Sequence, residues 1–197
     1  MLAKAPVSGY AKTRLTPLLG AEGAARLQAL LIRRALRTAT AARLGPVTLW
    51  GAPDAAHPVL RQLAAEAGVS LAAQPEGDLG RRMLAPFEAA PGPLVLIGTD
   101  CPVLESGDLA EAARLIAAGH DTVMAPAEDG GYGLIAAGRP LPALFDGVPW
   151  GTDGVAAATR ARAAAAGLGL AELRTIWDVD RPADVARLRR SGLLPDL

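Results

Sequence analysis

The segment PLVLIGTD (93–100) sets the fold class of this 197-residue chain. Its apolar residues follow one another without polar alternation, which is typical of a strand buried on both faces in a parallel sheet. We predict further short strands at 47–50, 69–73, 121–126, 132–137 and 173–180. Alanine-rich helical stretches lie between them, beginning near Ala21, Ala55, Asp78, Ser106, Asp153 and Arg181. This alternation predicts an α/β fold with three α/β/α layers around a mostly parallel mixed sheet.

The bulk composition fits a single domain covering residues 1–197. Hydrophobic residues make up 51% of the chain, and 20 Lys and Arg residues balance 20 Asp and Glu residues. This balance gives no general affinity for nucleic acid or for a membrane, so we expect neither as a partner. The one cysteine excludes an intrachain disulfide. A short N-terminus broken by proline and glycine is not a signal peptide, so we expect a cytoplasmic protein.

The opening segment AKAPVSGYAKTRL (3–15) is a candidate phosphate loop. It carries the cations Lys4, Lys12 and Arg14 without any acid, and it bends at Pro6 and Gly9. Backbone N–H groups and two cations at such a bend could hold a diphosphate, although an ordinary surface loop is equally consistent with the sequence. Only residues 1–3 precede the loop, so the first strand is either very short or truncated.

Acidic residues follow several of the predicted strands, where ligands bind in open α/β sheets. Asp100 ends the most apolar strand, and we favour a Mg²⁺ ligand over a turn cap at this position. Asp178 and Asp180 offer a second metal carboxylate, with helix capping by Asp180 as the alternative. Asp129 precedes two glycines that either let a ligand approach or form a hairpin turn.

Six segments, taken in order, resemble the GT-A-like nucleotide-diphospho-sugar transferase superfamily. Within it they are most similar to the radical-SAM/selenodomain-associated transferase 1 family, also known as arsenosugar-biosynthesis glycosyltransferases. The segments are AKAPVSGYAKTRL (3–15), GDLGRRM (77–83), LIGTDCPVL (96–104), PAEDGGYGLI (126–135), PWGTDGV (149–155) and DVDRPADV (178–185). The last motif departs from the family pattern, because Arg181 and Ala183 stand where Thr and Glu are usual, which weakens the expected helix start.

The resemblance implies a role for each candidate residue. The nucleotide and its phosphates would be bound by Lys4, Pro6, Gly9, Lys12, Arg14, Asp78 and Gly80. The acceptor would be bound by Gly130, Gly131, Tyr132, Trp150 and Thr152. The catalytic residues would be Asp100, Asp129 and Lys12, and a Mg²⁺ or Mn²⁺ cofactor would be held by Asp100, Asp178 and Asp180.

The resemblance thus predicts a metal-dependent transferase that uses a nucleotide-activated sugar and a small-molecule acceptor. The metal would neutralise the diphosphate leaving group while Lys12 and Arg14 stabilise its growing charge, with Asp129 as candidate general base. Two alternatives stay open at this point. One is nucleotidyl transfer from a nucleoside triphosphate to a phosphorylated acceptor, as in phospholactate guanylyltransferases, and the other is a non-catalytic nucleotide-binding protein. A homodimer is the oligomer we consider.

Overall fold

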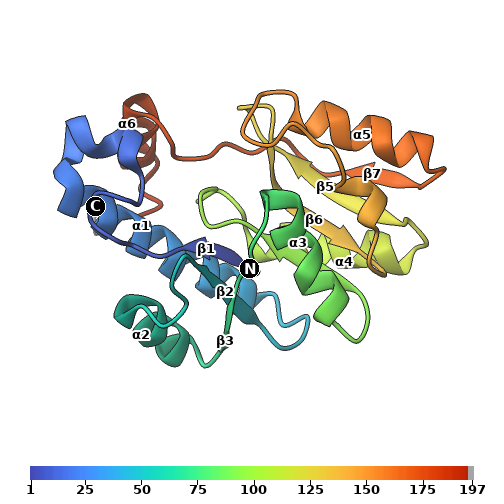
Figure 1. Ribbon diagram of the computed structural model, residues 1–197, viewed down its shortest axis with the longest axis horizontal. Coiled ribbons are helices and arrows are strands. Elements are labelled where there is room, and N and C mark those ends of the chain that lie inside the picture. The colour runs from blue at the N-terminus through green and yellow to red at the C-terminus, as the bar shows by residue number, and fades with distance from the viewer. Residues whose placement is uncertain (195–197) are drawn as a thin grey trace. The chain divides into compact units, whose positions relative to one another are not determined.

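A computed structural model describes residues 1–194 of the chain (Figure 1). These residues form two compact units that are interleaved along the sequence. The first unit contains Met1–Gln74, Gly98–Leu104 and the C-terminal segment from Asp178. The second contains Pro75–Ile97 and Glu105–Trp177. No helix of the described residues is both long enough and apolar enough to cross a membrane.

The first unit is built on a parallel sheet with the order β1-β2-β3. Its strands are β1 (Leu2–Lys4), β2 (Thr48–Ala52) and β3 (Ser70–Ala73). The first strand is therefore present and has only three residues. The helices of this unit are α1 (Thr16–Ala41), α2 (Pro58–Ala67) and α6 (Pro182–Ser191), with a short 3-10 turn, η1 (Thr13–Leu15), ahead of α1.

Helix α1 supplies much of the core of the first unit. Leu27, Leu31, Ile32 and Leu36 recur at helical spacing and are each at most 1% exposed. Figure 1 shows α1 lying alongside β1 and β2, and it also packs against α2. Gly20 has a φ of 70°, which interrupts the helix, so its regular part begins at Ala21 as the sequence predicts.

The second unit is built on a mixed sheet with the order β4-β6-β5-β7. Its strands are β4 (Leu94–Ile97), β5 (Thr122–Pro126), β6 (Tyr132–Ala137) and β7 (Leu170–Glu172). Its helices are α3 (Leu79–Ala89), α4 (Ser106–Ala117) and α5 (Val155–Ala165), with a 3-10 turn, η2 (Pro142–Leu144). Helix α4 packs against β4, β5 and β6, and α5 packs against β7.

The α/β class and the excess of parallel pairings are confirmed, but the prediction of one sheet is corrected to two hydrogen-bonded sheets. Strand β6 runs antiparallel to both β4 and β5, while β5 and β7 are parallel. The reason lies in the short connection 127–131 between β5 and β6, because a turn of this length can only join antiparallel neighbours.

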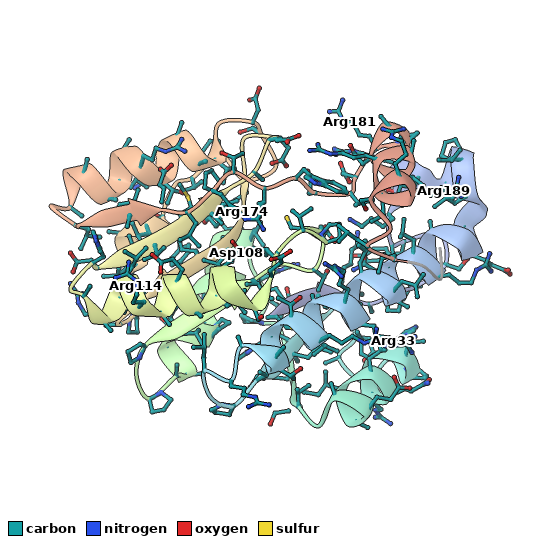
Figure 2. The ribbon with its side chains drawn as sticks, turned by 180° about the vertical axis from the view of Figure 1, so that it is seen from behind. Arg33, Asp108, Arg114, Arg174, Arg181 and Arg189 are labelled. Carbon is teal, nitrogen blue, oxygen red and sulfur yellow. The ribbon has the colours of Figure 1, made fainter. Side chains whose placement is uncertain are left out.

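The predicted strand at 173–180 is wrong, since the strand lies earlier, at β7. Beyond it the chain forms an isolated bridge between Ile176 and Ala127, just past the end of β5. The N–H groups of Leu173 and Ile176 also donate to the Met124 and Pro126 carbonyls, both at 2.9 Å. Arg174 turns away from the sheet and makes two hydrogen bonds to Asp108, of 2.9 and 2.7 Å, and Figure 2 shows these side chains pointing toward one another. Strand β5 also ends in Pro126, which has no N–H to continue the ladder.

Candidate functional site

Lys12 is the buried cation of the opening loop. The Val7 carbonyl accepts hydrogen bonds from the N–H groups of Tyr10 and Ala11, at 3.0 and 2.9 Å, and so closes the loop. Lys12 then adopts a left-handed conformation with φ 50° and ψ 44°, which L-residues rarely adopt. Its side chain is only 5% exposed. The sequence does not reveal this strain, because the position carries no glycine, asparagine or aspartate.

The Lys12 ammonium joins two segments that lie far from it in the sequence. Its Nζ donates a hydrogen bond of 2.7 Å to the Val179 carbonyl and lies 2.9 Å from Oδ1 of Asp100. The Val179 N–H in turn donates to the Asp100 carbonyl at 2.9 Å. Lys12, Asp100 and Val179 therefore form a closed triangle of contacts inside the first unit.

Asp100 is half-exposed and is held from behind by buried polar side chains. Its side chain is 50% exposed. The Thr99 hydroxyl donates to its Oδ1 at 3.3 Å and accepts from Nε2 of Gln28, also at 3.3 Å. The same Nε2 donates to the Lys4 carbonyl at 3.2 Å, at the carboxyl end of β1. Gln28 and Thr99 are 2% and 5% exposed, so the carboxylate is attached to a rigid part of the unit.

Arg14 makes the second contact between the opening loop and the C-terminal segment. Its guanidinium forms an ion pair with Asp180, and both side chains are partly exposed. Helix capping by Asp180, one of the two roles considered for it, is therefore wrong, because its carboxylate faces Arg14. Asp184 caps α6 instead, accepting from the N–H groups of Asp180 and Arg181 at 3.0 and 2.6 Å. The unusual residues of this motif thus do not prevent the helix from starting.

Lys12, Arg14, Asp100 and Asp180 are called the loop cluster below. Among residues 1–194, no three His, Cys, Asp or Glu side chains gather closely enough to hold a metal ion. Asp100, Asp178 and Asp180 are thus not a ready three-carboxylate site, because Asp100 is paired with Lys12 and Asp180 with Arg14. The oxygen donors still suit Mg²⁺ or Mn²⁺, since such ions are held by one or two carboxylates together with substrate phosphates.

The remaining residues of the opening loop lie at its surface or in its bend. The Lys4 ammonium sits over the Tyr10 ring, 4.1 Å from its centroid. Pro6 is buried, and the Val7 N–H donates to the Ala5 carbonyl at 2.8 Å across it. Gly9 has a φ of 75°, and no atom lies within 4 Å of where a Cβ would stand. The backbone conformation, and not a close neighbour, accounts for glycine here.

The second unit contains the candidate acceptor residues, and the two glycines form the turn between β5 and β6. The Asp129 carboxylate accepts from the Gly131 N–H at 2.9 Å. Gly130 has a φ of 87°, and a Cβ on it would lie 2.0 Å from the Asp153 carbonyl oxygen. Its own carbonyl accepts from the Ala156 N–H at 2.8 Å. Close approach of the protein's own backbone therefore explains Gly130.

Tyr132 and Trp150 both direct their polar atoms into the second unit. The Tyr132 hydroxyl points at the sulfur of Met83, 3.9 Å away. Burial raises the pKa of Tyr132 above its ordinary range, more than a hydrogen bond with Thr159 lowers it. Nε1 of Trp150 is buried without a hydrogen-bond partner among the described residues. A Cβ on Gly80 would lie 2.9 Å from this Nε1, so packing against the indole explains glycine at position 80.

Asp78 and Thr152 each satisfy backbone groups next to them. Asp78 is the N-cap of α3, and its carboxylate accepts from the Arg81 N–H at 2.8 Å. The Thr152 hydroxyl donates to the Pro149 carbonyl at 2.8 Å and accepts from the Gly154 N–H at 3.2 Å. Both residues are exposed, so these local contacts leave them accessible to a ligand.

Sequence reasoning missed Gln28 and Val179. Gln28 belongs to no motif. Its position among the apolar residues of α1 does indicate a buried polar side chain, and such a side chain needs a hydrogen-bond partner. Val179 contributes a backbone carbonyl, which no side-chain pattern can reveal.

Several solved structures are similar to this chain. A protein from Desulfovibrio desulfuricans G20, provisionally assigned as a nucleotide-diphospho-sugar transferase, is 29% identical over 97% of this chain and 85% of its own, with a TM-score of 0.85. A cytidylyltransferase from Leptospira borgpetersenii serovar Hardjo-bovis is 14% identical over 97% and 84%, with a TM-score of 0.61. Glucosyl-3-phosphoglycerate synthase from Mycobacterium tuberculosis, in complex with Mn²⁺, UDP and glucosyl-3-phosphoglycerate, is 12% identical over 83% and 72%, with a TM-score of 0.58.

These matches confirm the GT-A-like nucleotide-diphospho-sugar transferase fold. No curated protein shows significant sequence similarity to this chain. The family model described as "Uncharacterized protein conserved in bacteria" (DUF2064) matches residues 35–152, which is more than half of the chain, so the protein belongs to this family.

Proposed function

We propose that this protein is a metal-dependent transferase that uses a nucleotide-activated sugar as donor. The observation that carries the proposal is the pairing of a buried lysine with a strand-end aspartate in the loop cluster. A cation that has lost its hydration and an anion beside it are suited to a ligand that carries both charges, such as a nucleotide diphosphate with its metal. The transferases with the same fold support this choice.

In this proposal the residues of the first unit bind the donor. Asp100 holds the divalent ion, with Asp178 or Asp180 as the second carboxylate, and the ion when bound offsets the charge of the diphosphate. Lys12 and Arg14 bind the phosphate oxygens and stabilise the negative charge that grows as the bond from the sugar to the diphosphate breaks. Lys4, Pro6 and Gly9 shape the loop around the nucleotide.

The acceptor role of the second unit rests on the resemblance of its motifs. Asp129 is exposed at the tip of the β5–β6 turn and is the candidate general base for an acceptor hydroxyl. Gly130 and Gly131 form the turn that carries it. Trp150 and Thr152 are the further acceptor candidates, whereas the Tyr132 hydroxyl points at the sulfur of Met83, which favours a packing role.

Nucleotidyl transfer is the second candidate, because the match to the solved cytidylyltransferase extends over 97% of this chain. The two reactions release different products from the donor: sugar transfer releases a nucleoside diphosphate, and nucleotidyl transfer releases pyrophosphate. The membership in a particular transferase family, the cytoplasmic location and the homodimer stay predictions.

The test is a thermal-shift screen of nucleotides and nucleotide sugars with Mg²⁺ or Mn²⁺, since a ligand that binds the native state raises its melting temperature. We expect a shift that needs both nucleotide and metal. Analysis of the products from the best donor then separates the two reactions. Metal-dependent binding without any turnover would support a non-catalytic nucleotide-binding protein, and no binding of any nucleotide would refute the proposal.

A further inference from the structure

We propose that Lys12 makes metal binding at Asp100 conditional on the nucleotide, so that this site takes up a divalent ion together with a diphosphate and not alone. The inference rests on the proposed function and goes beyond it, because it assigns Lys12 a second task. Besides binding phosphate, its ammonium is paired with the carboxylate of Asp100 as long as no nucleotide donor is bound.

The first step of the argument is the burial of Lys12. An ammonium group that has lost most of its water needs a partner of opposite charge, and Asp100 supplies it at 2.9 Å. The Val179 carbonyl, at 2.7 Å, is a dipole and does not neutralise the charge. The left-handed backbone of Lys12 and the closed loop before it set the direction in which the side chain leaves the main chain.

The second step is the effect of a divalent ion that arrives by itself. Coordination by Asp100 would place a doubly charged ion beside the ammonium, whichever carboxylate oxygen it uses. It would also withdraw the negative charge that compensates Lys12, and a buried charge that loses its partner is strongly unfavourable. The Asp100 carboxylate is half-exposed and therefore accessible to an ion, but the Lys12 ammonium beside it repels a divalent ion that arrives alone.

The third step is the effect of a diphosphate. Its oxygens supply negative charge to Lys12 and complete the coordination of the ion. With both ligands present, the ammonium keeps a partner after Asp100 has turned to the metal. Each ligand thus removes the obstacle to the other, which makes their binding positively coupled.

The experiment measures the affinity for Mn²⁺ alone and for nucleoside diphosphates with Mn²⁺ in the wild type and in Lys12→Met. We use UDP, CDP, GDP and ADP, and carry the tightest binder forward. For Lys12→Met we expect about tenfold tighter binding of Mn²⁺ alone and about tenfold weaker binding of the diphosphate with Mn²⁺, both within the range that coupled sites show.

Two further variants act as controls. Arg61→Met removes an exposed cation of α2 in the same unit, outside the candidate site, so the affinity of this variant for Mn²⁺ alone should change less than twofold. Lys12→Gln removes the charge but keeps a donor for the Val179 carbonyl, and it should reproduce the gain in Mn²⁺ affinity if Lys12→Met does not fold. The melting temperature of each variant is recorded without ligand.

The outcomes separate this inference from the function on which it rests. Opposite changes for Mn²⁺ alone and for the diphosphate support it. If the wild type binds a diphosphate with Mn²⁺ and neither Lys12 variant gains affinity for Mn²⁺ alone, only this inference falls. If a Lys12 variant binds the diphosphate as tightly as the wild type, the coupling is refuted. If no diphosphate binds the wild type, the proposed function falls as well.

Discussion

Replacing Gly130 by alanine tests whether the glycine pair of the β5–β6 turn serves the fold or a ligand. The new Cβ would stand 2.0 Å from the Asp153 carbonyl oxygen and 2.6 Å from its carbon, where contacts below 3.0 Å essentially never occur. Both atoms are backbone, so no side chain can move aside to relieve the clash. The turn or the segment before α5 has to shift by about 1 Å, and side-chain insertion of this kind costs roughly 1–3 kcal/mol.

Two further costs add to this one. At a φ of 87° an L-residue is strained, which costs roughly 1–2 kcal/mol. The shift also weakens the hydrogen bond of 2.8 Å from the Ala156 N–H to the Gly130 carbonyl, worth about 1 kcal/mol. We therefore expect Gly130→Ala to lower the free energy of unfolding by roughly 3–6 kcal/mol, which for a chain of this size lowers the melting temperature by roughly 6–24 °C.

Gly131→Ala is the matched control. The atoms nearest to its Cβ would be those of the Asp129 carboxylate, the first at 3.2 Å, and its φ lies outside the left-handed region. A carboxylate can rotate away, so the loss of stability should stay below about 1 kcal/mol. Urea unfolding and thermal melting of both variants measure the difference. A Gly130→Ala protein as stable as the wild type but with impaired turnover would refute the packing explanation and favour close approach of a ligand.

Three other substitutions test the two units. Thr99→Val should weaken the binding of Mn²⁺ with nucleotide severalfold in a titration, while Thr99→Ser, which keeps the hydroxyl bonded to Asp100, should bind normally. Asp100→Asn should abolish metal-dependent turnover in a donor-hydrolysis assay, and it should also lower the melting temperature, because the buried Lys12 ammonium loses its charged partner. Asp108→Asn should lower stability by about 1 kcal/mol, because it weakens a helix cap and the contacts with Arg174. Burial raises the pKa of Asp108, but hydrogen bonds from Arg174 and the Glu105 N–H lower it more, so the net pKa lies below its usual value. This stability is present above the unfolded-state pKa near 4 and is lost as the pH falls through the folded-state pKa, so acid unfolding should show a smaller pH dependence in Asp108→Asn.

The sequence predicts the helices well because their signals are local. Asp78 lies at the N-cap of α3, and α6 begins directly after Arg181, as expected from caps and prolines that act within one turn. The prediction of the last strand is wrong because the position of this strand depends on its pairing with β5, some 50 residues away, and on the hydrogen bonds between Arg174 and Asp108. Neither partner can be read from the segment itself.

In the candidate site, too, some features can be predicted from the sequence and others depend on long-range contacts. That Lys12 and Asp100 lie near one another follows from the expectation that residues directly after strands gather at ligand sites. That they form a direct ion pair does not, because it depends on the left-handed backbone of Lys12 and on the Val179 carbonyl. The sequence gives least information about the glycines. It predicts Gly80 and Gly130 as ligand contacts, whereas the side chain of Trp150 packs against Gly80 and the backbone of Asp153 packs against Gly130.

The two cations at the end of the opening loop differ in what a phosphate would have to change. Arg14 has a side chain that is 66% exposed, so its ion pair with Asp180 is screened by water and is worth about 0–1 kcal/mol. It can reorient toward a ligand at little cost. Lys12 is buried and held by two oxygen atoms, so it cannot reorient without losing the Asp100 charge. A ligand at this loop therefore has to bring its own negative charge to Lys12, while Arg14 only has to exchange one exposed partner for another. For this reason we expect substitution of Lys12 to affect metal and nucleotide binding together, and substitution of Arg14 to affect chiefly the binding of the nucleotide.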